Sequence, residues 1–289
     1  MKKVQVLMST YNGEKYLREQ IDSILSQEGV KACLLVRDDG SKDNTINILK
    51  EYRDIEIIEG HNVGVYKSFF ELINKSGDYG YYSFADQDDV WDRDKLRIAI
   101  DMLDGRHDIP SVYASNTRLV DADLNFIKNE EDNPKTTLGS AFVKNFCTGC
   151  TMVFNAKLMN KLRYKLPSYV PMHDWWVNLV CLSIGGLSIY DTKPHMDYRQ
   201  HGENIYGAES DMIAKLRNRW EKFLNKPYHR DIMAKELLSI YENDINNEEF
   251  LILYAMANPN LHLLYDSRIK TSNLMTDLLF SICIALKKI

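Results

Sequence analysis

Two features are scarce in this 289-residue chain: strong net charge and long apolar runs. The formal net charge is -5, which argues against a nucleic-acid-binding protein because such proteins usually carry a basic footprint. The stretch from Leu278 to Leu286 is nearly all apolar, yet it is shorter than the roughly 20 residues that a membrane-spanning helix needs. With 45% hydrophobic and 27% charged residues, the chain is expected to be globular, with a buried core.

Cysteines are also few, and their number, five, is odd. An odd count in a chain of this size favours a reducing compartment over a disulfide framework. The start, MKKVQVLMSTYNG, is basic but apolar only for the length of a strand, so no secretory signal is expected there. Cys147 and Cys150 form a C-x-x-C pair without a second cysteine pair, which favours buried thiols in a tight loop over a zinc or redox site. We therefore expect a cytoplasmic protein.

Strand-like and helix-like segments alternate in the first hundred residues. The expected strands are 4–9, 33–39, 55–60 and 81–86, and the expected helices are 14–26, 44–52, 66–74 and 95–103. This alternation predicts βαβ units, and hence an α/β fold with a mostly parallel central sheet flanked by helices.

The rest of the chain is less regular. A strand with a polar edge is expected at 112–121, a polar loop at 121–140, a helix at 174–184 and strand-like segments at 187–201. From Met212 onward the pattern becomes helical and charged. We expect one α/β domain over residues 1–210 and a C-terminal helical region over 211–289.

Polar residues follow all four expected strands of the first hundred residues. In open α/β sheets, ligands bind at the carboxyl ends of the strands. The residues at these ends are Thr10, Tyr11 and Asn12 after the first strand, Asp38 and Asp39 after the second, Asn62 after the third, and Asp86, Gln87, Asp88 and Asp89 after the fourth.

The run YYSFADQDDVW places three acids directly after an apolar strand. Buried acids are rare unless they are paired or bound to metal, and Mg²⁺ is usually held by one or two carboxylates plus substrate phosphates. An EF-hand loop does not fit, because its sixth and twelfth positions would be Trp91 and Arg97. A helix N-cap by Asp89 or Asp92 would explain one acid but not three. The run therefore predicts a site for Mg²⁺ or Mn²⁺ together with a phosphate.

Four motifs together resemble family 2 glycosyltransferases with the GT-A fold: STYNG (9–13), RDDGSKDNT (37–45), HNVGVYKSF (61–69) and FADQDDVW (84–91). The segment DQDDVWDRDKL is similar to the form found in bacterial rhamnosyltransferase-like members that build cell-wall and capsular polysaccharides. The resemblance covers about residues 1–210. It implies a nucleotide-sugar donor and a divalent metal.

The resemblance also implies roles for individual residues. The nucleotide-sugar site would comprise Thr10, Tyr11, Asn12, Asp39, Asn62, Lys67, Asp86 and Gln87. Asp88 would hold the metal, and His201, in the lid-like segment YRQHGENIYG (198–207), would complete its shell. Asp174, in PMHDWWVN, would be the general base that accepts the proton of the acceptor hydroxyl, although an N-cap role is the alternative. Acceptor and sugar contacts would come from Thr148, Gly149, Trp175, Trp176 and Arg199. Since two adjacent tryptophans cannot both face one core, at least one is expected to meet solvent or ligand.

The expected function is an inverting, metal-dependent transfer of a sugar, L-rhamnose from dTDP-rhamnose in the leading interpretation, to a saccharide acceptor, expected to be lipid-linked. A UDP-galactose- or UDP-hexose-dependent transferase and a non-catalytic sugar-nucleotide-binding subunit are the alternatives. The last helix is expected either to dock on the domain or a second subunit, or to lie on the membrane with Lys287 and Lys288 at anionic headgroups. The second alternative would place the enzyme at the inner face of the cell membrane.

Overall fold

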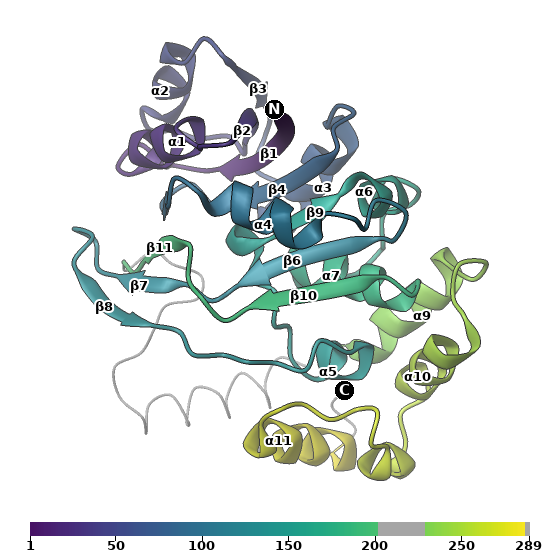
Figure 1. Cartoon of the computed structure of the whole chain (residues 1–289). Helices are drawn as coiled ribbons and strands as arrows, with labels where there is room; N and C mark the ends of the chain where they lie inside the picture. Colours follow the sequence, from purple (N-terminus) through teal and green to yellow (C-terminus); the bar gives the residue numbers. More distant parts are fainter. Residues whose placement is uncertain (202–228, 287–289) are drawn as a thin grey trace.

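The computed structural model describes residues 1–201 and 229–286 (Figure 1). Its helices and strands follow the order β1 (Lys2–Thr10), α1 (Leu17–Leu25), β2 (Val30–Asp38), α2 (Thr45–Glu51), β3 (Ile55–Glu59), α3 (Val65–Lys75), β4 (Tyr81–Ala85), β5 (Val90–Trp91), α4 (Lys95–Leu103), β6 (Ser111–Ser115), β7 (Arg118–Val120), β8 (Phe126–Asn129), α5 (Leu138–Val143), η1 (Gly149–Thr151), β9 (Val153–Asn155), α6 (Ala156–Leu162), α7 (His173–Ser183), β10 (Leu187–Asp191), β11 (Met196–Arg199), α9 (Arg230–Ile240), α10 (Asn247–Ala257), η2 (Leu261–Tyr265) and α11 (Leu274–Ala285).

The central sheet has seven strands in the order β10-β6-β9-β4-β1-β2-β3. Strand β9 runs antiparallel to its neighbours β4 and β6, and the other neighbouring pairs are parallel. The expected α/β fold with a mostly parallel sheet is therefore confirmed. Because β1, β2 and β4 are mutually parallel, the loops that follow them leave the same edge of the sheet.

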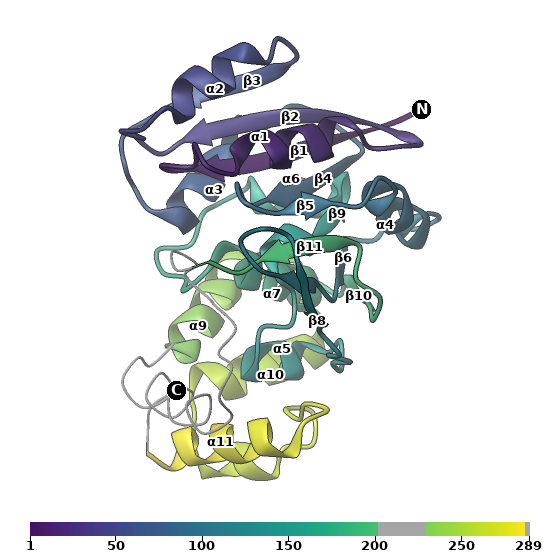
Figure 2. The same ribbon diagram turned by 90° about the vertical axis from the view of Figure 1, so that its left-hand side faces the viewer.

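Both faces of this sheet are buried. Side chains of successive strand residues point to opposite faces, so each strand contributes to the core on either side. In β1, Leu7 belongs to one apolar cluster, with α3, α5, α6 and α7, whereas Val6 and Met8 belong to a second cluster with α1, α2 and α4. In β4, Phe84 and Tyr81 divide between the same two clusters. Figure 2 shows the helices on either side of the strands. Burial on both faces explains why these strands appear in the sequence as continuous apolar runs.

A second sheet, in the order β5-β11-β7-β8, lies beside the carboxyl end of β4. Its outer strand β8 pairs antiparallel with β7, and α5 begins at Leu138 with Thr137 as its cap. The prediction of a continuous loop over 121–140 is therefore wrong. All four residues of β8 are exposed, so the strand has no buried face to produce an alternating pattern in the sequence.

The C-terminal helices pack on the same core as the α/β domain. Arg230 at the start of α9 is buried, and its guanidinium donates to the carbonyl oxygens of Phe142 (2.7 Å) and Val143 (3.1 Å) at the end of α5. Phe280 and Ile284 of α11 belong to the cluster that also contains α5 and α7. The expected boundary near residue 210 lies outside the described residues. Within 1–201 and 229–286, no helix is both long and apolar enough to cross a membrane.

Candidate active site at the carboxyl edge of the central sheet

The loops after β1 and β4 are joined by the side chain of Gln87. Its amide oxygen accepts hydrogen bonds from the Thr10 hydroxyl (2.6 Å) and the Tyr11 backbone N–H (2.8 Å), and its Nε2 donates to the Tyr11 carbonyl (3.2 Å). A side chain at Gly13 would collide with this amide, since an added Cβ would lie 2.5 Å from its oxygen. Three expected donor-site residues, Thr10, Tyr11 and Gln87, are thus brought together, with the Tyr11 side chain left exposed.

The loops after β1 and β2 are joined by Asn12. It adopts a left-handed backbone conformation (φ 49°), which Asn tolerates better than most residues. Its backbone N–H donates to the Ser41 hydroxyl (2.9 Å), and its side-chain oxygen accepts from the Lys42 N–H (2.9 Å). Asp38 in turn accepts from the N–H groups of Gly40 and Ser41, so this carboxylate shapes the turn itself.

Asp39 connects the end of β2 to the start of α3. Its carboxylate pairs with the buried guanidinium of Arg37 and accepts from the N–H groups of Val63 (2.8 Å) and Gly64 (2.9 Å). The contact of Asp39 with a base or ribose stays a prediction, and in this structure the carboxylate fixes the 62–64 segment. Asn62 and Lys67 are both exposed beside that segment, as a ligand-contacting role requires.

The acidic loop 86–89 holds its three carboxylates in different surroundings. Asp88 lies 2.8 Å from the Nε2 atom of His201, so the two expected metal ligands are adjacent. Asp86 is half-buried, and its burial, together with the nearby carboxylates of Asp88 and Asp174, raises its pKa to about 7. A cation bound next to Asp86 would favour its charged form and so offset the effects of burial and of the neighbouring carboxylates.

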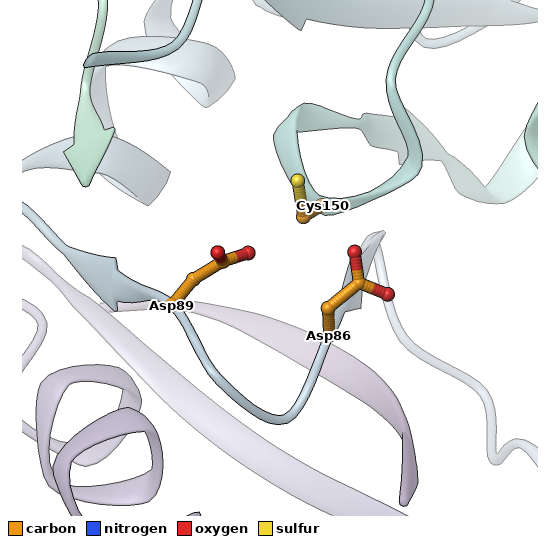
Figure 3. Close-up of side chains that lie close together, drawn as sticks. All are labelled: Asp86, Asp89 and Cys150. Carbon is orange, nitrogen blue, oxygen red and sulfur yellow. The ribbon is translucent and has the colours of Figure 1, made fainter. Parts of the chain in front are cut away.

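Asp89 is fully buried and faces Asp86 and the thiol of Cys150 (Figure 3). One ligand atom from each of the three residues lies within 4.8 Å of the others. One oxygen of Asp89 accepts from the Arg199 backbone N–H (3.2 Å), and the other has no hydrogen-bond partner among the described residues. Burial raises the pKa of both Asp89 and Cys150 well above their usual ranges. The N-cap role considered for Asp89 is therefore wrong, and its side chain points into the site instead.

These donors fit the divalent metal that the fold family implies. Carboxylate oxygens and a His nitrogen are ordinary ligands for Mn²⁺, and carboxylates suit Mg²⁺. The orphaned oxygen of Asp89 and the raised pKa of Asp86 both show acidic groups that lack a positive partner within hydrogen-bonding distance. Asp88 and His201 are the residues that would hold the ion, with Asp86 next to it.

A buried cation lies behind this acidic group. Lys95, the first residue of α4, is buried and its Nζ lies 3.5 Å from the ring centre of Trp91. Burial lowers its pKa to about 7, an effect that the charges of Cys150 and Asp89 partly oppose. Sequence reasoning assigned no role to Lys95 or to Cys150, because a lysine seven residues after an acidic motif and one thiol of a C-x-x-C pair carry no pattern that indicates mutual contact.

The two cysteines of the C-x-x-C pair have different surroundings. The Cys150 thiol meets the acidic loop, whereas the Cys147 sulfur lies 3.9 Å from the hydroxyl of Ser188. Both thiols are buried, and the turn between them contains Thr148, which is exposed, and Gly149, which is buried. The segment is thus a tight loop with buried thiols, as expected, and this loop also contributes to the active site.

Asp174 lies in the first turn of α7 and faces that loop. Its carboxylate accepts from the Gly149 N–H (3.1 Å) and from the N–H of Trp175 (2.6 Å). Burial raises its pKa to about 6, although these hydrogen bonds act in the opposite direction. Its charge in turn raises the pKa of Asp86, so the expected base and the expected donor-site acid are electrostatic neighbours.

The structure buries four of the five residues that were expected to contact the acceptor or sugar, Gly149 among them, and leaves only Thr148 exposed. Trp175 and Trp176 are only 5% and 1% exposed, and the Trp175 indole N–H donates to the Ala141 carbonyl (2.7 Å). The prediction that one tryptophan faces solvent or ligand is therefore wrong: α7 is buried on every side, and both tryptophans belong to the same apolar cluster. Arg199 is buried too. It donates to the Asp88 carbonyl (2.8 Å) and pairs with Glu19, which fixes the acidic loop from below.

Comparison with known proteins assigns the chain to a family. Residues 5–163 match the family described as glycosyl transferase family 2. The chain belongs to this family, and it is a glycosyltransferase that uses a nucleotide-sugar donor.

Two curated relatives cover most of the chain. The dTDP-rhamnosyl transferase RfbG of Shigella flexneri is 32% identical over 74% of this chain and 80% of its own length. The UDP-Glc:alpha-D-GlcNAc-diphosphoundecaprenol beta-1,3-glucosyltransferase WfgD of Escherichia coli is 27% identical over 78% of this chain and 88% of its own length.

Solved structures share the fold at lower identity. Residues 1–349 of Staphylococcus aureus TarS in complex with UDP-GlcNAc match with a TM-score of 0.57 and 17% identity, covering 100% of this chain and 88% of that one. The mannosyltransferase PcManGT of Pyrobaculum calidifontis, in complex with GDP-Man and Mn²⁺, matches with a TM-score of 0.53 and 16% identity, covering 99% and 86%. These matches establish the GT-A fold for the chain.

Proposed function

We propose that the protein transfers L-rhamnose from dTDP-L-rhamnose, with inversion at the anomeric carbon, to a saccharide acceptor in cell-wall or capsular polysaccharide synthesis. The observation that carries the donor assignment is the 32% identity to a dTDP-rhamnosyl transferase over three quarters of the chain. The adjacent Asp86, Asp88 and Asp174 at one sheet edge support the transfer reaction.

The residues at the sheet edge divide into those that hold the donor and one that moves a proton. The loops tied together by Gln87 and Asn12 hold the nucleotide, and Asp86 hydrogen-bonds the ribose. Asp88 and His201 hold a divalent ion, which when bound neutralises the diphosphate and stabilises it as a leaving group. The Asp174 carboxylate takes the proton of the acceptor hydroxyl while that oxygen attacks the anomeric carbon and the bond to the diphosphate breaks.

A UDP-hexose donor is the second candidate. It is favoured by the 27% identity to WfgD, whose name gives UDP-Glc as donor. That match covers 88% of WfgD, whereas the match to RfbG covers 80% of RfbG. The family match speaks against the other alternative, a non-catalytic sugar-nucleotide-binding subunit. The simultaneous presence of the acidic loop and a buried carboxylate with a pKa of about 6 argues for catalysis.

Donor choice is tested by thermal unfolding with dTDP-rhamnose, UDP-galactose, UDP-glucose and UDP-GlcNAc, each with and without Mn²⁺. A ligand that binds only the folded state raises the apparent Tm. We expect the largest shift with dTDP-rhamnose, and we expect Mn²⁺ to increase it. If a UDP-sugar raises the Tm more than dTDP-rhamnose does, that UDP-sugar is the donor and the rhamnose assignment is wrong. Binding without turnover, measured with any saccharide acceptor on a lipid diphosphate, would favour the non-catalytic subunit.

We also propose that the acceptor is lipid-linked and that α11 contacts the cytoplasmic membrane surface. One face of α11 is buried and packs on the core through Phe280 and Ile284. The opposite face is apolar as well, with exposed side chains at Leu274, Met275 and Leu278, and Leu286 just after the helix is exposed too. Lys287 and Lys288 follow in the sequence. Apolar side chains flanked by lysines are typical of helices that lie at an anionic lipid surface.

Flotation with vesicles that contain anionic lipid tests this contact. The full chain is expected to float, and the double variant Leu274→Glu/Leu278→Glu is expected to stay in the soluble fraction, because two charges would have to enter the apolar part of the interface. Tyr164→Glu, an exposed aromatic just after α6, is the matched control and should float like the unchanged protein. Equal flotation of the double variant, or no flotation of the unchanged protein, would contradict the proposal.

A further inference from the structure

His173, the residue before the expected base, is a buried imidazole without a polar partner. It is 2% exposed, and neither ring nitrogen has a hydrogen-bond partner among the described residues. A buried polar group without a hydrogen-bond partner lowers the stability of a fold. A polar side chain in such a position next to a reactive group therefore needs an explanation.

Two phenylalanines form a slot around this ring. Phe69 of α3 is stacked on it, with ring centres 3.7 Å apart and planes at 14°, and Phe84 of β4 meets it edge-on at 4.9 Å. Phe84 lies near the end of β4, two residues before Asp86 of the acidic loop. The imidazole thus connects α3 and the end of β4 with the start of α7.

The ring also supports the Gly149 turn from below. A Cβ placed on Gly149 would lie 3.0 Å from the His173 Nε2 atom and 3.5 Å from the Asp174 Cβ. This close approach leaves the Gly149 N–H pointing at the Asp174 carboxylate, to which it donates at 3.1 Å. The chain of contacts therefore runs from Phe69 through the imidazole and the Gly149 turn to the base.

We propose that His173 is a positioning residue, whose uncharged ring in the Phe69–Phe84 slot sets the distance between the Gly149 turn and the Asp174 carboxylate. The inference rests on the proposed function, because it assigns to Asp174 the role of base. The ring itself contacts neither substrate nor solvent, so it acts only through its neighbours.

The lack of charge is part of this role. A cation in contact with Asp174 would favour the carboxylate form and make it a weaker base. Burial between the two phenylalanines lowers the pKa of His173 to about 3, so the ring is neutral throughout the range in which Asp174 titrates. The slot therefore provides a rigid ring without weakening the base.

Two substitutions separate ring shape from ring chemistry. His173→Phe keeps a flat ring in the slot, and His173→Ala removes it. We expect kcat of the alanine variant to fall by about 10- to 100-fold, as misplacement by about 1 Å would cause, while the donor Kd measured by calorimetry stays within about twofold. The phenylalanine variant is expected to retain kcat within about threefold and an unchanged pH profile.

The pH profile of kcat distinguishes a positioning role from a packing role, because loss of packing alone would not shift it. Water that enters the emptied slot of His173→Ala would reduce the burial of Asp174, so the acidic limb of the profile should move to lower pH. If His173→Phe loses as much activity as His173→Ala, the ring nitrogens take part and the proposal is wrong. If His173→Ala unfolds more easily but keeps its kcat and pH profile, the residue is only a packing element and the proposal is equally wrong.

A double-mutant cycle with Gly149→Ala tests the contact without any activity measurement. The added methyl group clashes with the imidazole in the unchanged background but finds space beside His173→Ala, so the two losses in the free energy of unfolding should be clearly non-additive. Additive losses would overturn the proposal. This cycle is measured by denaturant unfolding, so it tests the contact even if no donor supports turnover. A lack of turnover with every donor would refute the proposed function and leave the result of the cycle unaffected. Should His173→Ala fail to fold, Phe69→Leu opens the slot from the other side for the same cycle.

Discussion

Replacing Asp174 with Asn is expected to lower kcat by about 1,000-fold, within the range that loss of a general base usually causes, and to leave donor binding intact. The amide keeps the size of the carboxylate, and its single oxygen can still accept from the Gly149 N–H, so the turn should stay in place. The amide nitrogen cannot accept, so the hydrogen bond from the Trp175 N–H to the second oxygen is lost. It cannot take the proton of the acceptor hydroxyl. Turnover with dTDP-rhamnose and calorimetry with dTDP measure the two effects separately.

The pH dependence of the unchanged enzyme follows from the same residue. Burial raises the pKa of Asp174 to about 6, and only the deprotonated form can act as a base. The rate is therefore expected to be low below pH 6, to rise through about pH 6 and to level off above it. In Asp174→Asn this limb should disappear from the residual activity, because the titrating group is gone.

Asp277→Asn is the matched control, since this carboxylate accepts a hydrogen bond from Thr271 in the C-terminal region, away from the sheet edge. It should change neither kcat nor the pH profile. If Asp174→Asn weakens dTDP binding as strongly as it lowers kcat, the residue shapes the donor pocket and is not the base. A retained acidic limb in that variant would point to a different titrating group.

Replacing Asp88 with Ala is expected to remove metal-dependent turnover, a loss of about 1,000-fold if the ion contributes several kcal/mol to charge stabilisation in the transition state. Asp88 and His201 are adjacent, and in the proposed function both hold the ion, so the variant would lose one of the two proposed ligands. The measurement is the Mn²⁺-induced rise in Tm in the presence of dTDP, together with the rate at saturating Mn²⁺. Both should vanish in the variant.

Asp94→Ala is the control for this change, because Asp94 is an exposed acid nearby that pairs with Arg97. It should keep the full Mn²⁺ response. The informative contrary result is a normal response in Asp88→Ala combined with its loss in Asp89→Ala and Cys150→Ser. That outcome would place the ion in the group formed by Asp86, Asp89 and Cys150.

Local sequence was sufficient to predict the strands whose residue pattern follows directly from their burial. The apolar strands β1, β2 and β4 are buried on both faces, so each appears as an unbroken apolar run, and parallel strands deliver their following residues to one edge. For this reason the sequence alone predicts that the motifs after these strands, from Thr10 to Asp88, lie at one site, and it indicates their family.

Tertiary structure decided what depends on contacts between distant segments. Trp175 and Trp176 are both buried because α7 is covered on every side, and the strand β8 pairs with β7 despite having no buried face. Asp89 and Cys150 are 61 positions apart and meet only because η1 folds over the acidic loop. Sequence patterns report the periodicity of single elements, whereas the partner of a buried charge is set by the packing of elements against one another. The positions of Asp89, Lys95, Cys150 and His173 around the predicted site are accordingly properties of the fold.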